Sequence, residues 1–297
     1  MTISEDQLKM WAKQGPTPQF TATYETLKNC LNDSSSLYYP KDFSIFLQGS
    51  YKNDSNVYGD SDVDVVIRLN QTYYSDLSNL SEEDKKLYNT ARSDAGYTLD
   101  QFKTDVTGWL IKKYGNDVQP GTKAIYIKGN GSRRNADVLV CCKHRRYIRF
   151  KSWDDQSYHE GISFFNSGGT RVDNFPTQHS DNCTKKHQDT KNWYKHTVRI
   201  YKNLRNTMIE KKIIEDGLAP SYFLEGLLWN VPLDRFGGTE QQNFRDTLDW
   251  LWKADRSKFA CANDLYYLFH PTSLVTWHSE KCEKFLSKAI DYWNADS

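Results

Sequence analysis

Two aspartates separated by one valine, Asp62 and Asp64, are the first residues whose spacing suggests chemistry. They open the segment 62–69, DVDVVIRL, which alternates and then becomes apolar, as a partly buried β-strand does. Because side chains alternate along a strand, both carboxylates would share one face and repel each other unless a cation lies between them. Oxygen ligands of this kind suit Mg²⁺. A solvent-exposed edge strand with acidic outward positions is the alternative interpretation.

Gly49-Ser50 and Asp137 are the other candidates for chemistry. Gly49 and Ser50 follow a short apolar segment, and backbone N–H groups with a serine hydroxyl can hold phosphate oxygens. Asp137 lies at the start of a second apolar segment, where a buried acid needs a partner such as a shared metal. Taken singly, the GS dipeptide carries little information, and Asp137 could be a strand-initiating residue bonded to a turn. Together, these residues predict a site where carboxylates, metal ions and phosphate groups meet.

The elements that must position these residues indicate an α+β fold. Strand-like segments lie at 43–49, 62–69, 123–129, 136–142, 145–150 and 161–165, and helical patterns at 3–32 and 98–114. After about residue 185 the pattern changes to amphipathic helices at 191–212, 220–231, 239–254 and 279–293. We therefore predict a core of a mixed sheet with flanking helices over residues 1–185, a helical lobe over 186–297, and a central cleft between them.

Bulk composition narrows the class of ligand. Lys and Arg total 39 against 38 for Asp and Glu, so the net charge is +1. A protein that grips long DNA or RNA through phosphates usually carries a basic excess, so free nucleotides fit better. Mean hydropathy is −0.78 and the first 15 residues contain no apolar signal core, which predicts a cytoplasmic protein without membrane spans.

The six cysteines contain no CxxC pair and are expected to be free thiols. One spacing could indicate a zinc site, because His179, Cys183 and His187 recur every four residues and would share a helix face. The surrounding segment is polar and turn-like, and the sequence offers no obvious fourth ligand. Chance spacing is therefore the favoured interpretation.

The order of strand, GS, loop, DxD and strand, with a third aspartate on a later strand, resembles the polymerase-β-like nucleotidyltransferases. The chain further resembles the bacterial cGAS/DncV-like nucleotidyltransferases, and within them the CdnE clade. The resembling segments are 47–69, 135–142, 172–182, 193–206 and 219–232, and they cover both predicted lobes.

The resemblance implies two sets of site residues. Those that hold two Mg²⁺ or Mn²⁺ ions and carry catalysis are Asp62, Asp64 and Asp137. Those that bind the nucleotides are Gln48, Gly49, Ser50, Asn166, Lys202, Ser221 and Tyr222. Asp137 would also help to activate the acceptor hydroxyl, and Lys202 would reach the triphosphate.

Three of these implied roles have structural alternatives. Lys202 could belong to an ordinary solvated helix face, given its basic neighbours. Tyr222 could pack in the core as readily as lie against a base. Asn166 could read a uracil edge, because its amide offers a donor and an acceptor, or it could belong to a hairpin turn in NSGG.

The resemblance implies an enzyme that makes a cyclic dinucleotide second messenger from nucleoside triphosphates in bacterial anti-phage (CBASS) signalling. A separate effector protein would respond to that product. One alternative is nucleotide transfer to an RNA end or a protein. Another is a non-catalytic nucleotide-binding protein, against which stands the presence of all three carboxylates.

Overall fold

A computed structural model describes residues 3–15, 17–58 and 62–295. They form two compact units, each described here by itself. The sheet unit contains residues 17–48 and 62–176, and the helical unit contains 3–15, 49–58 and 177–295. The helical unit thus includes two segments from the first fifth of the chain. The domain boundary between residues 185 and 186 stays a prediction.

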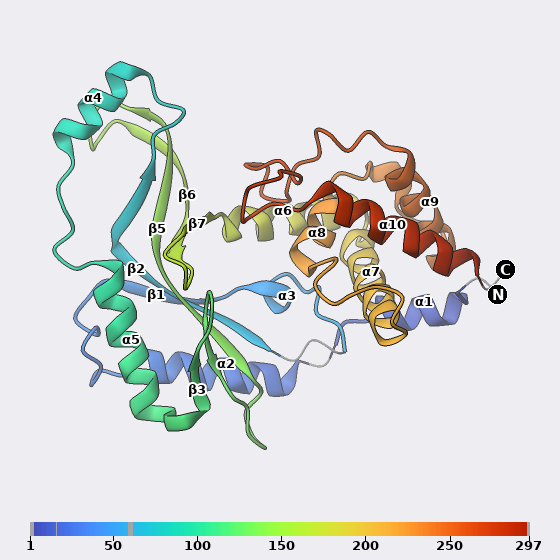
Figure 1. The fold of residues 1–297 in the computed structure, drawn as a ribbon, viewed down its shortest axis with the longest axis horizontal. Helices are drawn as coiled ribbons and strands as arrows, with labels where there is room; N and C mark the ends of the chain where they lie inside the picture. The colour runs from blue at the N-terminus through green and yellow to red at the C-terminus, as the bar shows by residue number, and fades with distance from the viewer. Residues whose placement is uncertain (1–2, 16, 59–61, 296–297) are drawn as a thin grey trace. The chain divides into compact units, whose positions relative to one another are not determined.

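A mixed β-sheet forms the centre of the sheet unit (Figure 1). Its strands run in the order β1-β2-β5-β4-β3, and β6 pairs with β5 and β7. β2 and β5 are parallel, whereas the other pairs are antiparallel. The strands are β1 Phe43–Leu47, β2 Val63–Asp76, β3 Val118–Pro120, β4 Ile125–Ile127, β5 Ala136–Phe150, β6 Gln156–Phe165 and β7 Arg171–Asn174.

Helices α2 (Pro18–Leu31) and α5 (Leu99–Tyr114) pack together against this sheet (Figure 1). α5 begins with a capping box in which Thr98 and Gln101 satisfy each other's backbone N–H groups, and it ends at Gly115. α4 (Glu82–Ala91) follows Ser81, whose hydroxyl caps the helix by accepting the Asp84 N–H. The 3₁₀ turn Gly115–Asp117 leads from α5 into β3.

Helix α7 (Trp193–Glu210) is the central helix of the helical unit, and its buried side chains are part of the hydrophobic core of that unit. The other elements are α1 Glu5–Ala12, α3 Gly49–Lys52, α6 Pro176–Asp189, α8 Ser221–Trp229, the 3₁₀ turn Leu233–Arg235, α9 Glu240–Lys253 and α10 Ser279–Asn294. The mixed sheet with flanking helices and the C-terminal helical domain confirm the predicted fold class.

The helical pattern at 3–32 divides into two helices that belong to different units. Between them, the N–H of Gly15 donates to the carbonyl of Asn56, and a side chain at Gly15 would overlap the backbone of Val57. Pro18 then begins α2, where a first helical turn tolerates a proline.

The polar segment around 179–187 is helical, so its interpretation as turn-like was wrong. Apart from Cys183, the buried residues of this helix are the polar or charged His179, Ser180 and Lys186, so the segment lacks the apolar periodicity that reveals a helix. The Lys186 ammonium group donates to the carbonyls of Trp229 and Val231. Among the described residues, no helix combines the length and the apolar composition needed to cross a membrane.

Candidate active site

The aspartates of β2 and β5 come together because the two strands are parallel. Asp64 and Asp137 are register partners on these neighbouring strands, which places their side chains on the same face about 4.8 Å apart. Val65 and Val138, the next pair, are fully buried on the opposite face. Asp62 directly precedes β2, and all three aspartates are half-buried. The structure therefore brings the three predicted carboxylates into one cluster.

The electrostatics of this cluster fit a cation. Burial raises the pKa of Asp137, and the negative charge of Asp62 raises it further. Neighbouring carboxylates repel each other when both are ionised, and a divalent cation bound between them stabilises the ionised form of each. Gln48, which follows β1, donates its N–H to the Asp64 carbonyl at 3.0 Å, and its side-chain oxygen is buried without a hydrogen-bond partner.

Gly49 and Ser50 open the segment 49–58 of the helical unit. Gly49 has a φ of 72°, a left-handed conformation that favours glycine, and the short helix α3 begins there. The Ser50 carbonyl accepts the N–H of Ser55 at 2.9 Å, which closes the segment into a tight turn. The Asp54 carboxylate, within the turn, accepts a hydrogen bond from the ammonium group of Lys195, with 3.0 Å between Nζ and Oδ2.

Lys202 is fully buried and donates to the Ser55 carbonyl at 2.9 Å, so it does not belong to a solvated helix face. At the start of α8, the Ser221 hydroxyl accepts from Arg205 at 3.1 Å. The Tyr222 ring stacks on His179 at 4.7 Å, with 18° between the ring planes. Contact between these side chains and a nucleotide stays a prediction.

Asn166 forms the turn between β6 and β7, as its structural alternative supposes. Its side-chain oxygen accepts the N–H groups of Gly168 and Thr170 at 3.0 and 2.9 Å. The turn uses only the oxygen of the amide, so the Nδ2 group is the part of Asn166 that could read a base. The turn and the base-reading role are therefore compatible.

Comparison with known proteins decides the family. The sequence profile of the cGAS/DncV-like nucleotidyltransferase C-terminal helical domain matches residues 181–294. A cyclic UMP-AMP synthase of Rhodothermus marinus is 39% identical, over 99% of this chain and 98% of the relative. The chain belongs to the cGAS/DncV-like nucleotidyltransferases.

Two solved structures are similar to this nucleotidyltransferase. The structure of the Rhodothermus marinus CdnE c-UMP-AMP synthase with Apcpp and Upnpp has a TM-score of 0.87 at 38% identity, covering 99% of this chain and 97% of that one. That of the Elizabethkingia meningoseptica CdnE cyclic dinucleotide synthase with GTP and Apcpp has a TM-score of 0.80 at 28% identity, covering 98% and 99%. They confirm that the chain is an enzyme of the CdnE group.

The helical unit of the nucleotidyltransferase also contains a buried group of metal-ligand type, formed by His179, Cys183 and Glu225. One ligand atom from each lies within 4.8 Å of the others. Tetrahedral zinc ligands lie about 3.3 Å apart. The His179 Nε2 is only 2.6 Å from a Glu225 oxygen, which is a direct hydrogen bond. His187 instead accepts a hydrogen bond from the backbone N–H of Lys195 at 3.2 Å. His179, Cys183 and His187, which are spaced four residues apart in the sequence, therefore do not converge on one point.

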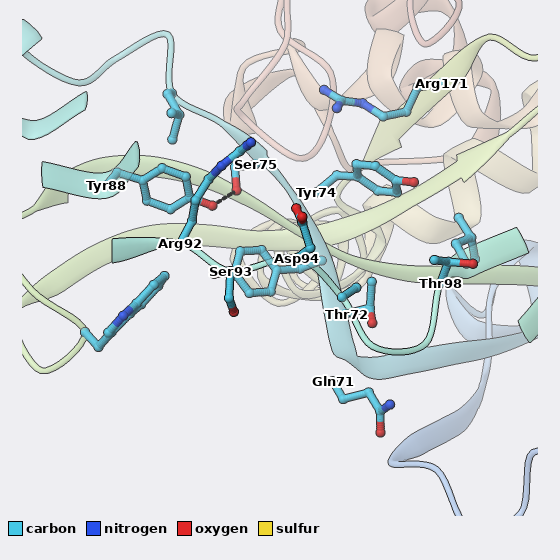
Figure 2. Close-up of a pocket in the computed structure, with 15 residues that line it drawn as sticks. Gln71, Thr72, Tyr74, Ser75, Tyr88, Arg92, Ser93, Asp94, Thr98 and Arg171 are labelled. Carbon is cyan, nitrogen blue, oxygen red and sulfur yellow. Dashed lines mark hydrogen bonds between the residues drawn. The ribbon is translucent and has the colours of Figure 1, made fainter. Parts of the chain in front are cut away.

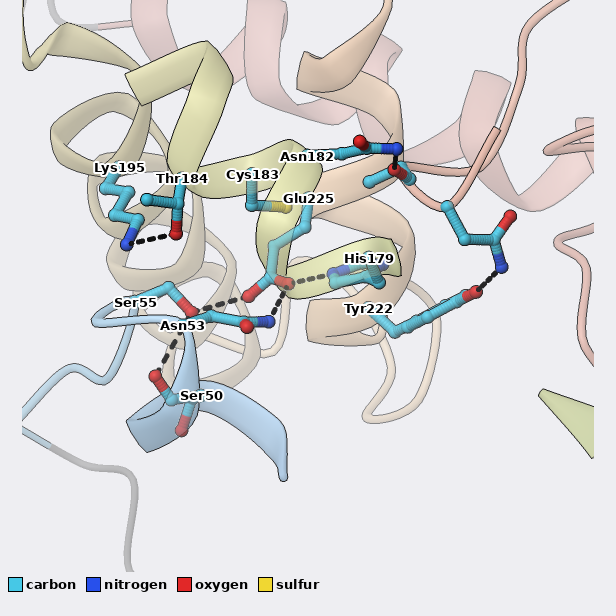
Figure 3. A network of polar contacts seen from close by, with 12 residues as sticks. Ser50, Asn53, Ser55, His179, Asn182, Cys183, Thr184, Lys195, Tyr222 and Glu225 are labelled. Carbon is cyan, nitrogen blue, oxygen red and sulfur yellow. Dashed lines mark hydrogen bonds and ion pairs between the residues drawn. The ribbon is translucent and has the colours of Figure 1, made fainter. Parts of the chain in front are cut away.

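Glu225 is the residue of this group that the sequence prediction missed. Figure 3 shows Ser55, Asn53 and His179 converging on its carboxylate. The signal was present, because Glu225 is the single charged residue of the helix SYFLEGLLW. A charge inside an apolar helix is expected to have a buried partner.

A pocket of about 430 Å³ lies elsewhere in the sheet unit, beside the second half of β2 (Figure 2). Gln71, the nearest residue of its wall along the strand, is seven residues beyond Asp64, roughly 23 Å away. Its wall includes Tyr73, Tyr74, Tyr88, Trp153, Arg92 and Arg171. The pocket is therefore separate from the aspartate cluster.

Proposed function

We propose that this nucleotidyltransferase joins two nucleoside triphosphates into a cyclic dinucleotide at the aspartate cluster. The register pairing of Asp64 with Asp137 carries the proposal, because it fixes two carboxylates side by side on a rigid sheet. Asp62, Asp64 and Asp137 would hold two Mg²⁺ or Mn²⁺ ions. Such ions neutralise phosphate charge and make a hydroxyl group easier to deprotonate.

The protein's own groups would bind and orient the triphosphates. Gln48, through the N–H groups of its side-chain amide, and the Gly49-Ser50 turn would meet the donor phosphates. Lys202 would add a cation and Ser221 a hydroxyl group, and Tyr222 would offer a flat ring to a base. These roles rest on the resemblance of both units to the CdnE synthases.

The product would act as a second messenger in bacterial anti-phage (CBASS) signalling and be read by a separate effector protein. Because its substrates are free nucleoside triphosphates, we place the reaction in the cytoplasm. The names of the relatives include cyclic UMP-AMP and cyclic dipurine synthases. The identity of the two bases in the product is therefore the question that experiment must answer.

Purified protein with Mg²⁺ or Mn²⁺ and labelled ATP, GTP, CTP and UTP tests the proposal. A phosphatase-resistant small product whose mass equals two nucleotides joined without free phosphates supports it. A labelled polymer or labelled protein would contradict it, and so would the absence of pyrophosphate release under every pair of nucleotides.

The Asn166→Asp variant tests whether Asn166 chooses the base. Aspartate keeps the oxygen that accepts from Gly168 and Thr170, so the turn should persist, but it removes the Nδ2 donor. If Asn166 reads a pyrimidine edge, we expect the share of pyrimidine-containing product to fall about tenfold, as one lost specific hydrogen bond can cause. Mass spectrometry of products from mixed triphosphates measures this share. An unchanged product ratio would assign Asn166 to the turn alone.

A further inference from the structure

One buried carboxylate, that of Glu225, connects the segment 49–58 to helices α6 and α8 (Figure 3). One of its oxygens accepts the Ser55 hydroxyl at 2.5 Å. The other accepts the Asn53 amide at 2.9 Å and the His179 ring N–H at 2.6 Å. Two of its three partners therefore belong to the turn that carries Ser50.

The connection continues from Glu225 to Ser50 through the backbone. Ser55, which donates its hydroxyl to Glu225, also donates its N–H to the Ser50 carbonyl at 2.9 Å. From the other side, Lys202 donates to the carbonyl of Ser55. The shape of the turn thus depends on a short chain of hydrogen bonds that begins at a negative charge.

His179, the partner of Glu225 on α6, also contacts Tyr222. Tyr222 precedes Glu225 by one helical turn of α8 and stacks on the His179 ring. Glu225 and His179 are each 4% exposed, so water cannot replace a lost partner. A displacement of Glu225 or His179 would therefore change both the conformation of the turn and the position of the Tyr222 ring.

We infer that Glu225, held by His179, is a positioning residue that fixes the 49–58 turn so that Ser50 can meet the donor phosphates. The inference rests on the proposed function, because it assigns Glu225 to the same nucleotide site. Glu225 itself contacts no substrate in this assignment. Its negative charge orients the donors of Asn53 and Ser55, and these two side chains hold the backbone between them.

Variants on the turn side test this inference, because they leave the pair between α6 and α8 intact. Ser55→Ala and Asn53→Ala each remove one hydrogen bond to Glu225. We expect each to raise the KM for the triphosphates and the Kd for α,β-methylene ATP with Mg²⁺ about tenfold, as loss of a hydrogen bond to a charged group does. We expect kcat to change less than about threefold, because binding is what is lost.

Thr247→Ala is the matched control. Thr247 is a fully buried hydroxyl of α9 in the same unit, and it donates to the carbonyls of Asn243 and Phe244. Its removal should lower the melting temperature about as much as Ser55→Ala does, without a change in KM or Kd. If Thr247→Ala weakens nucleotide binding equally, or if both turn variants bind like the wild type, the positioning role is overturned.

The two readouts separate failure of the inference from failure of the proposed function. Wild-type protein that binds the analogue but releases no cyclic product would contradict the proposed function, while the Kd values would still decide the positioning role. Wild-type protein that binds no analogue would contradict both.

Discussion

The Asp62→Asn, Asp64→Asn double variant is expected to form cyclic product at least about a thousandfold more slowly than the wild type. Metal ions at a phosphoryl-transfer site stabilise developing charge by several kcal/mol, and about 4 kcal/mol corresponds to this factor. Asparagine keeps the size of each side chain but removes the charge that would hold the ions. Pyrophosphate release and product mass, measured at saturating Mg²⁺, give the ratio.

The stability of this variant provides an independent check. The charge of Asp62 contributes to the raised pKa of Asp137, so without metal the three carboxylates repel one another. Their partial removal should leave the melting temperature of the metal-free protein unchanged or slightly higher. A large fall in activity without a fall in melting temperature is the signature of a lost metal ligand.

Asp42→Asn is the matched control for charge. Asp42 lies in the sheet unit and accepts the Asn70 amide, a hydrogen bond that asparagine can keep. Its product formation should stay within about twofold of the wild type, as for surface substitutions away from a site. A double variant at Asp62 and Asp64 that retained a tenth of wild-type activity would remove these residues from catalysis.

Glu225→Ala and His179→Ala are each expected to lower the free energy of unfolding by about 3–5 kcal/mol, because each leaves a buried charge without its partner. Burial opposes the charged form of His179, but Cys183 and Glu225 outweigh it and raise its pKa to about 10. Burial likewise opposes ionisation of Glu225, and contact with His179 lowers its pKa overall. The pair is thus ionised at neutral pH.

This pair makes stability depend on pH in a defined direction. His179 titrates near 6.5 when unfolded and near 10 when folded, so its contribution is complete below about pH 6.5 and is lost as the pH rises through 10. Lys186, whose pKa burial lowers to about 8, titrates in the same range with the opposite effect. Denaturant unfolding at pH 6.5, 8 and 9.5 should therefore be compared between the wild type and His179→Gln.

The difference in unfolding free energy between these two proteins should shrink steadily from pH 6.5 to 9.5, because His179 of the unfolded wild type loses its proton in this range while His179 of the folded protein keeps it up to about pH 10. The titration of Lys186 cancels in this difference. A constant difference across the range would mean that His179 is neutral in the folded protein and that the hydrogen bond to Glu225 involves no charge.

The aspartate cluster was predictable because its strands follow simple patterns. The alternation of Val63 and Val65 with Asp62 and Asp64 marks one buried and one open face, and β2 has that pattern. The third carboxylate of the cluster, that of Asp137, was predictable because Asp137 lies at the start of the apolar segment that forms β5. Their pairing in register could not be predicted, because it depends on which of several strands lie side by side in the sheet.

The helical unit was predictable where apolar periodicity is strong and unpredictable where polar groups are buried. The four predicted helices after residue 185 match α7 to α10 within about two residues at each end. α6 was missed because its inward face holds His179 and Lys186, whose hydrogen bonds replace apolar contacts. Glu225 was missed because its partners lie 46 to 172 residues away in sequence.

The separation of Glu225 from its partners in the turn has a consequence for how the chain folds during its synthesis. Ser55 precedes Glu225 by 170 residues, a delay of roughly 10–30 s at ordinary translation rates. During that time the turn has no carboxylate to bind. A fragment cut at the boundaries of the C-terminal helical domain, 181–294, would keep Glu225 but lose Ser55, Asn53 and also His179. Such a fragment would have to bury the Glu225 charge without any of these three donors, so we expect the isolated domain to be less stable than the same helices in the full chain.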